Sequence, residues 1–425
     1  MGCISFGGPA GQIAILHQEL VVARRWISEQ RFLHALNYCM VLPGPEAQQL
    51  ATYLGWLLHG TRGALVAGSL FVLPSFFILV SLSWAYVVWG STPVVASMFY
   101  GIKPVVVAIV AAAAWRIGTR ACSTAFLASV AALSFGLTAL AGTPFPAILA
   151  IAALLGWAAS RFVPAQIGHG AVHETAAGGP GDEFVIGDSS PTPEHARAVP
   201  LDWLPTLLIG AGLWLLVLGA VVYAGGGLDG TLARMALFFS KAALLTFGGA
   251  YAVLPYVFDA AVARYSWLTP GQVLDGLALG ETTPGPLIMV VTFIGFVGAW
   301  GQAPFGPEHL LAGALAAAAV VTFCTFLPSF LFILIGAPLV ERTRDALRVT
   351  APLRAITAAV VGVIANLALV LGEHALIPGT DGDLDWVAAA IALAAGVALL
   401  RFRLGVPVLV VAGALLGLGL HLLRA

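Results

Sequence analysis

The residues with the clearest chemical potential are two triplets, Pro43-Gly44-Pro45 and Pro284-Gly285-Pro286. Proline lacks a backbone N–H and fixes its own φ, so each triplet ends one helix and begins the next. A helix that begins at Pro45 or Pro286 presents unpaired amides in its first turn, where the helix dipole is positive. Such an end favours a negatively charged ligand. The triplets therefore predict an anion site at two breaks in helical structure.

A second motif is repeated at the same spacing. Phe6-Gly7-Gly8 returns 241 residues later as Phe247-Gly248-Gly249, which is also the interval between the two Pro-Gly-Pro triplets. With a changed offset, the Leu-Pro-Ser-Phe segment at 73–76 returns at 327–330. Each motif alone could simply shape a turn or permit close helix packing. Four breaks at matched positions of a duplicated unit instead favour a role in a transport pathway.

Polar side chains beside the breaks could bind or repel an anion. Glu46 either interacts favourably with the dipole of its own helix, or must be protonated or displaced before an oxyanion binds. The second reading would couple protons to transport, and Glu281 admits the same argument less strongly. Lys241 either attracts a dianion or reaches toward a membrane interface. The uncharged candidate donors are Gln12, Gln48, Gln49 and Thr283.

The composition identifies the environment of the chain as a lipid bilayer. Hydrophobic residues make up 60% of it and charged residues only 9%, against roughly 25% in soluble domains. Arg, Lys, Asp and Glu are absent from seven windows of a length suited to spanning helices. These windows are residues 63–102, 121–160, 204–228, 309–340, 355–372, 386–400 and 404–423. The sequence predicts an all-α polytopic membrane protein, and the lack of a basic aromatic patch argues against nucleic acid as a partner.

One hydrophilic stretch divides the chain. Residues 161–202 carry six acidic residues, three histidines and a Gly-Gly-Pro-Gly segment, a composition typical of a disordered linker. We therefore expect an N-terminal membrane repeat at 1–160, a linker at 161–202, a connecting transmembrane helix at 203–230 and a C-terminal membrane repeat at 231–425. The loose spacing of the histidines does not suggest a metal site.

The positive charges predict that the two repeats have opposite orientations. Lys and Arg favour cytoplasmic loops. In the first repeat they follow the Phe-Gly-Gly segment and the helix after Pro104, whereas the second repeat reverses this bias. The unpaired helix at 203–224 supplies the extra crossing that inversion needs. The same reasoning makes the segments around the breaks re-entrant, with broken helices at membrane depth, a geometry tolerated where backbone lines a cavity.

Five segments have a familiar pattern, namely SFGGPAGQ (residues 5–12), RWI (25–27) and LPGPEAQQLA (42–51), with TFGGAY (246–251) and TPGP (283–286) as second-repeat versions. With these segments the chain resembles the chromate ion transporter family in its two-domain, long-chain form. It implies a multi-pass protein of the bacterial inner membrane that exports chromate and gives chromate resistance. Composition and spacing alone do not name chromate.

Several alternatives stay open. The same fold could import or exchange sulfate or another tetrahedral oxyanion, and the sequence does not exclude a passive anion channel. A membrane-embedded enzyme should show paired catalytic carboxylates, a His-rich metal cluster or a Ser/His couple at the breaks, and none is visible, so we expect neither enzymatic activity nor a cofactor or metal. The driving ion, the direction of transport and homo-oligomer formation are not determined by the sequence.

One difference between the repeats concerns the first break. Only five residues precede Phe6, whereas an apolar helix from Thr231 to Thr246 precedes Phe247. The first half-helix therefore looks shortened in comparison with the second. We expect either that the start codon has been assigned too late or that the first hairpin lacks its entry arm.

Overall fold

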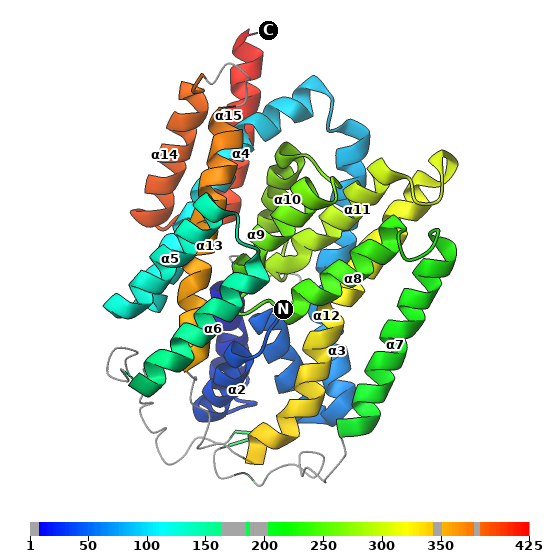
Figure 1. Ribbon diagram of the computed structural model, residues 1–425, viewed down its shortest axis with the longest axis vertical. Coiled ribbons are helices and arrows are strands. Elements are labelled where there is room, and N and C mark those ends of the chain that lie inside the picture. The colour runs from blue at the N-terminus through cyan, green and yellow to red at the C-terminus, as the bar shows by residue number, and fades with distance from the viewer. Residues whose placement is uncertain are drawn as a thin grey trace.

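The computed structural model describes residues 8–162, 184–187, 190, 203–342, 351–377 and 383–424. Among these residues the structure is helical apart from loops and one isolated bridge, which confirms the predicted all-α fold (Figure 1). Seven helices within the described ranges are long and apolar enough to cross a membrane, in agreement with a polytopic membrane protein. These are Glu46–Trp89, Pro93–Ala121, Phe145–Phe162, Trp203–Ala224, Pro307–Pro338, Ala351–Leu376 and Val406–Leu423.

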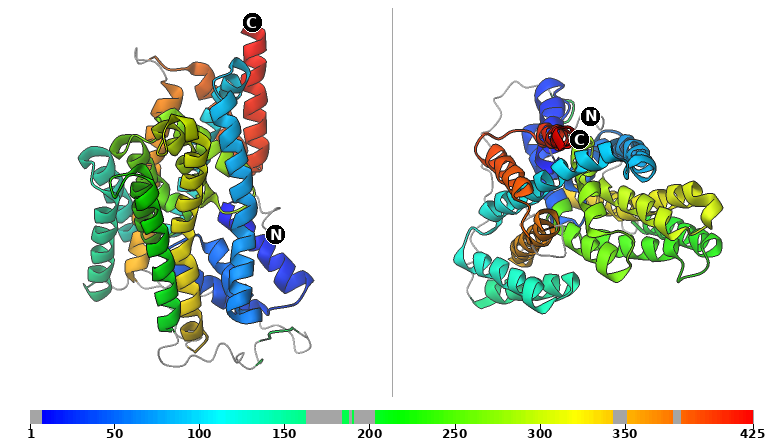
Figure 2. Two further views of the ribbon diagram at one scale, coloured as in Figure 1. Left: turned by 90° about the vertical axis from the view of Figure 1, so that its right-hand side faces the viewer. Right: turned by 90° about the horizontal axis from the view of Figure 1, so that it is seen from above.

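The helices of the N-terminal half are α1 to α6. Their bounds are α1 Gly8–His17, α2 Glu29–Val41, α3 Glu46–Trp89, α4 Pro93–Ala121, α5 Ala125–Ala141 and α6 Phe145–Phe162, with a π-helix, η1 Gln18–Ala23, after α1. Helix α3 contains a kink at His59 and Gly60. Its first arm follows the Pro-Gly-Pro triplet, and its second arm runs along most of the molecule (Figure 2).

The remaining helices are α7 to α15. They are α7 Trp203–Ala224, α8 Thr231–Leu244, α9 Ala250–Asp259, α10 Pro270–Thr282, α11 Val290–Gln302, α12 Leu310–Arg342, α13 Ala351–Leu376, α14 Trp386–Leu400 and α15 Val406–Arg424. Three short elements join them, a π-helix η4 Ala260–Arg264 and two 3-10 turns, η5 Leu287–Met289 and η6 Pro307–His309. Helix α7 packs on α8 and α12 and leaves most of its apolar side chains exposed, as expected of a helix facing lipid.

The duplicated sequence produces duplicated local structure. Helices α2 and α10 both contain 13 residues, and each follows a short helix that ends in a π-helical turn. Their N-caps, Ser28 and Thr269, are 241 residues apart and cap in the same way, with the side-chain oxygen accepting from the backbone N–H three residues later. The repeat seen in the sequence is therefore also present in the capping chemistry.

Helices of each half pack against helices of the other half. Helix α4 packs against α14 and α15 of the second half, whereas α13 packs against α5 and α6 of the first. Glycines allow the close approach, since a Cβ on Gly101 of α4 would collide with a backbone carbonyl of α15, and one on Gly362 of α13 would collide with a carbonyl of α5. The two halves thus form one interlocked helical body.

The hairpins around the triplets lie toward opposite ends of this body. Helix α2 lies at the lower end in Figure 1, and α10 lies toward the upper end. The long helices α3 and α12, which contact each other, run along the long axis beside them (Figure 2). The Pro-Gly-Pro triplets follow the C-terminal ends of α2 and α10.

Part of the linker differs from the disordered loop expected over 161–202. Ile186 forms a parallel bridge with Ile27, and its backbone N–H donates to Trp26 O at 2.9 Å. Composition predicted disorder because acids, glycine and proline dominate the segment as a whole. Ile186 is nevertheless buried in the apolar cluster of the first half, and that burial stabilises the local pairing.

Candidate functional site

The two Pro-Gly-Pro triplets break the helices where the sequence predicted. Helix α2 ends at Val41 and α3 begins at Glu46, while α10 ends at Thr282 and the chain resumes as a 3-10 turn at Leu287. The central glycines, Gly44 and Gly285, have φ values of +131° and +115°. Side chains other than glycine rarely adopt this backbone conformation, so glycine is required at both breaks.

Each triplet is held by a serine from the other half of the chain. The Ser75 hydroxyl, on α3, donates to the Pro284 carbonyl. Ser329, on α12, lies against the other triplet, because a Cβ added to Gly44 would stand 2.5 Å from its Oγ. Both serines belong to the repeated Leu-Pro-Ser-Phe segment. The repeat therefore places equivalent serines on opposite breaks.

The Phe-Gly-Gly break of the second half lies against the first triplet. The backbone N–H of Gly44 donates to Thr246 O at 2.7 Å. The Glu46 Oε1 atom lies 3.7 Å from the point where a Cβ on Gly249 would stand. On the other side, the Gln12 amide of α1 donates to the Gly285 carbonyl. Breaks from the two halves are thus joined directly to each other.

This arrangement brings the N-terminal ends of two helices together. Helix α3 has Pro45 as its N-cap and α9 has Gly249, and neither receives a side-chain capping hydrogen bond. The first-turn amides of an α-helix have no partner within the helix, and the dipole makes this end positive. Glu46 and Gly249 are neighbours across the interface between the halves. Two positive helix ends therefore face one region, which suits an anion.

Buried amide side chains surround this region. Gln48 and Gln49 are fully buried on the first turn of α3. Gln49 Nε2 donates to Pro43 O at 2.8 Å, and Gln48 Nε2 donates to Thr52 Oγ1 at 2.9 Å. Within the described residues, the side-chain oxygens of both glutamines lack a hydrogen-bond partner. Gln49 thus holds the break, and both amide oxygens are available to a hydrogen-bond donor beside it.

The two candidate carboxylates have different surroundings. Glu46 is half-buried, and among the described residues its carboxylate makes neither a hydrogen bond nor an ion pair. Glu281 is buried and accepts a hydrogen bond from the Tyr251 hydroxyl of α9. Thr283, the residue after α10, is also buried, but its hydroxyl donates to Leu279 O of that helix. Glu46 is thus the less restrained of the two carboxylates, and its Oε1 atom lies beside the start of α9.

Other predicted site residues are placed differently. The Lys241 side chain is exposed on α8, and Phe247 is half-buried beside the second break. Phe6 and Gly7 lie outside the described residues, and Gly8 is the first residue of α1. Among the described residues there is no group of three His, Cys, Asp or Glu side chains that could hold a metal ion.

Sequence reasoning did not assign Ser75, Ser329 or Tyr251 to the site. The two serines carried a signal, because they occupy equivalent positions in the repeated Leu-Pro-Ser-Phe segment. That segment established the duplication, but nothing in it indicated which backbone the hydroxyls would contact. Tyr251 ends the TFGGAY segment that carries the family resemblance, but nothing in that segment indicated that its hydroxyl would contact Glu281.

Comparison with known proteins shows the same duplicated pattern. The family described as Chromate transporter matches residues 1–157 and 233–418 of this chain. The chain belongs to the chromate transporter family. The match covers parts of both halves of the chain and leaves out residues 158–232, which include the linker and α7.

This chromate transporter family member is similar to several curated proteins. It is 29% identical to a chromate transport protein of Cupriavidus metallidurans over 98% of this chain and 90% of the relative. It is 33% identical to a chromate transport protein of Pseudomonas aeruginosa over 88% and 79%, and 28% identical to a probable chromate transport protein of Synechococcus elongatus over 88% and 83%. The relatives are named as transport proteins rather than enzymes, as expected. No solved structure matches the chain.

Proposed function

We propose that this protein moves chromate, a tetrahedral dianion, across the bacterial inner membrane, with export giving chromate resistance. The family and the names of the relatives support the substrate. The observation that carries the proposal is the proximity of the Glu46 carboxylate, at the start of α3, to Gly249, at the start of α9. It brings two positive helix ends from different halves to one place, where a dianion would be stabilised without a fixed cation. Because the helix ends carry only partial charges, such a site releases the ion more easily than a site that contains a buried arginine.

In this proposal the two halves are inverted repeats that work by alternating access. Helices α2 and α10 lie toward opposite ends of the molecule, and packing partners are exchanged between the halves. Both features are expected of inverted repeats around a central site. Movement of one half against the other would expose the meeting helix ends first to one side of the membrane and then to the other.

Sidedness labelling tests the inversion. A cysteine at position 94, at the start of α4, and a cysteine at position 345 should react with a membrane-impermeant reagent from opposite sides. The positive charges around 342–348 favour a cytoplasmic position for that region. Labelling of both positions from the same side would refute the inverted arrangement, and it would leave the assignment of substrate untouched.

Flux measurements test the substrate and the coupling. Purified protein in oriented vesicles should take up labelled chromate, and sulfate should be compared at the same concentration. A pH gradient and a membrane voltage should be imposed separately, because each isolates one driving force. Chromate flux that saturates and responds to a pH gradient supports a proton-coupled transporter. Flux that rises linearly with concentration and ignores the gradient indicates a channel, and preference for sulfate would replace chromate as the substrate.

A further inference from the structure

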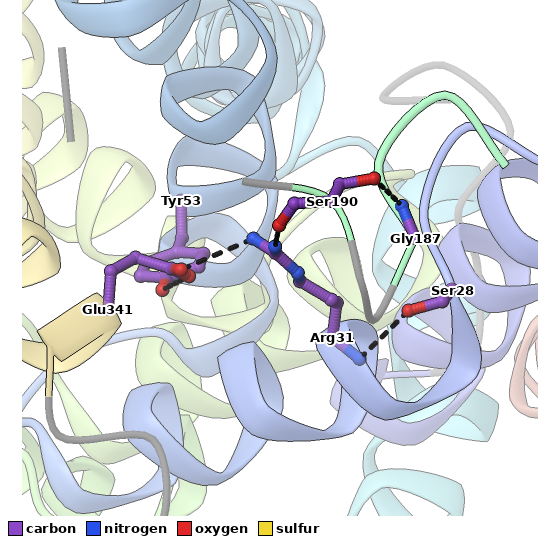
Figure 3. Close-up of polar contacts among 6 residues, drawn as sticks. All are labelled: Ser28, Arg31, Tyr53, Gly187, Ser190 and Glu341. Carbon is purple, nitrogen blue, oxygen red and sulfur yellow. Dashed lines mark hydrogen bonds and ion pairs between the residues drawn. The ribbon is translucent and has the colours of Figure 1, made fainter. Parts of the chain in front are cut away.

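A buried ion pair joins the two halves at the end of the molecule nearest the linker. Arg31, on α2, lies with its Nη1 atom 3.3 Å from Glu341 Oε2, on α12. Their side chains are only 4% and 1% exposed. The Tyr53 hydroxyl of α3 donates to Glu341 Oε1 at 2.6 Å, and Arg31 Nη2 donates to the Ser190 carbonyl of the linker at 2.7 Å (Figure 3). This pair therefore ties α2, α3 and α12 together.

A second pair repeats this plan with different residues. Lys103 Nζ, on α4, lies 3.6 Å from Asp275 Oδ1, on α10. The Tyr86 hydroxyl of α3 donates to Asp275 Oδ2 at 2.8 Å. In both pairs the cation and the tyrosine come from the first half, and the carboxylate comes from the second. At each pair, a buried carboxylate of the second half thus contacts both a cation and a tyrosine hydroxyl of the first half.

The two pairs lie on opposite sides of the breaks. Arg31 precedes Pro43 by 12 residues, which is about 18 Å along a helix, and Asp275 precedes Pro284 by 9 residues, about 14 Å. Helix α2 lies toward the lower end in Figure 1 and α10 toward the upper end. The pairs are therefore separated from each other by the region where the helix ends meet.

We propose that the pair of Arg31 with Glu341 and the pair of Lys103 with Asp275 close opposite ends of the transport pathway, and that each pair separates when its end opens. The inference rests on the proposed function and adds the residues that close the pathway. Separating two charges in a dry interface is costly, because each loses its partner without gaining water. If the halves part and water enters, both charges are solvated and that cost falls. Each pair therefore stabilises the closed state of its own end.

The two ends are not equally closed in this conformation. The Lys103 side chain is 32% exposed, against 4% for Arg31. The linker adds to the closure at the Arg31 end, where Ser190 accepts from Arg31 and Ile186 pairs with Ile27. We therefore assign the described conformation as closed at the linker end, with the Lys103 end the looser of the two.

Native Cys39 provides a reporter for this closure. It is fully buried on α2, between Arg31 and the break, and its side chain lies within electrostatic range of Glu46. Cys3, Cys122 and Cys324 are first replaced by serine so that Cys39 is the sole thiol. The rate of its reaction with a small charged thiol reagent is then measured in vesicles, with the reagent added to one face at a time. This rate measures access to the pathway and does not depend on which ion is transported.

Glu341→Gln should raise the rate of Cys39 labelling from the linker end at least about tenfold, because losing one partner of a buried pair strongly favours the separated state. The matched control is Asp229→Asn, which breaks an exposed pair with Arg234 of the same 3.3 Å length and should leave the rate within about twofold. Asp275→Asn should instead raise labelling from the opposite face. Tyr53→Phe keeps both charges and should raise the rate of Cys39 labelling from the linker end by a smaller factor. This variant provides a second measurement if the Glu341→Gln protein does not insert into the membrane.

Charge exchange completes the test. Arg31→Glu combined with Glu341→Arg should restore slow labelling at the linker end. Labelling at the wild-type rate in Glu341→Gln and Tyr53→Phe would overturn the proposal, as would faster labelling from the same face in both Glu341→Gln and Asp275→Asn. Chromate flux measured in the same vesicles reports separately on the proposed function, so closure and substrate can fail independently.

Discussion

Glu46 is the residue whose replacement tests the site most directly. Its Oε1 atom lies 3.7 Å from the position of a Cβ on Gly249, at the start of α9. An oxyanion bound to the first amides of α9 would have its centre roughly 5 Å from this carboxylate, from ordinary hydrogen-bond lengths. At an effective dielectric constant near 20, a single charge and a dianion at that distance repel by about 7 kcal/mol. Partial exposure of Glu46 lowers this value, but the ionised carboxylate and the dianion still compete for one place.

Glu46→Gln removes the charge and keeps the shape of the side chain. We expect chromate to bind the variant at least about tenfold more tightly at neutral pH, which corresponds to only about 1.4 kcal/mol of the repulsion. In the wild type, binding should strengthen as the pH falls, because protonation of the carboxylate removes its charge. The variant should lose this part of the pH dependence, and its transport should respond less to an imposed pH gradient.

The assay is chromate flux into vesicles at several pH gradients. The wild type and Glu46→Gln are compared at each pH, so that the effect of protonation of chromate itself is the same for both proteins. Glu308→Gln, in the exposed 3-10 turn before α12, is the control for loss of a carboxylate. If Glu46 only stabilises its own helix, its replacement should cost roughly 0.3 to 1 kcal/mol of stability and leave the coupling intact. Identical gradient dependence in the wild type and Glu46→Gln would refute its role in transport.

Two further predictions concern the breaks. Gly249→Leu should abolish chromate transport, because the φ of +91° disfavours any side chain by about 1 to 3 kcal/mol and the leucine would enter the space beside Glu46. Gly136→Leu, at a position with open space around it, should insert and transport normally, and equal chromate resistance in cells carrying either variant would contradict the assignment. Ser75→Ala should lower the free energy of unfolding by about 1 to 3 kcal/mol, since it leaves the Pro284 carbonyl buried without its donor. Ser81→Ala, which removes an exposed hydroxyl on the same helix, should change it little, and equal thermal shifts in detergent for both variants would show that the contact across the halves is unimportant.

The sequence by itself determined the environment, the helices and the positions of the breaks. Hydropathy depends on side-chain type alone, so the apolar windows identify spanning helices without knowledge of their partners. The breaks are equally local, because proline cannot continue a helix and Gly44 and Gly285 adopt a backbone conformation that other residues avoid. Duplication then predicted that the same local structure would occur twice, as the caps Ser28 and Thr269 show.

Only the tertiary structure decided which surfaces meet. Lys241 was a site candidate, yet its side chain is exposed, because lipid and protein interior are both apolar and the sequence of α8 does not distinguish the face that each covers. Arg31 could be interpreted from sequence only as a charge that orients the chain. Its contact with Glu341, 310 residues away, depends on how the two halves pack. The same holds for Ser75 and the Pro284 carbonyl, since no local preference of either residue specifies a partner 209 positions away.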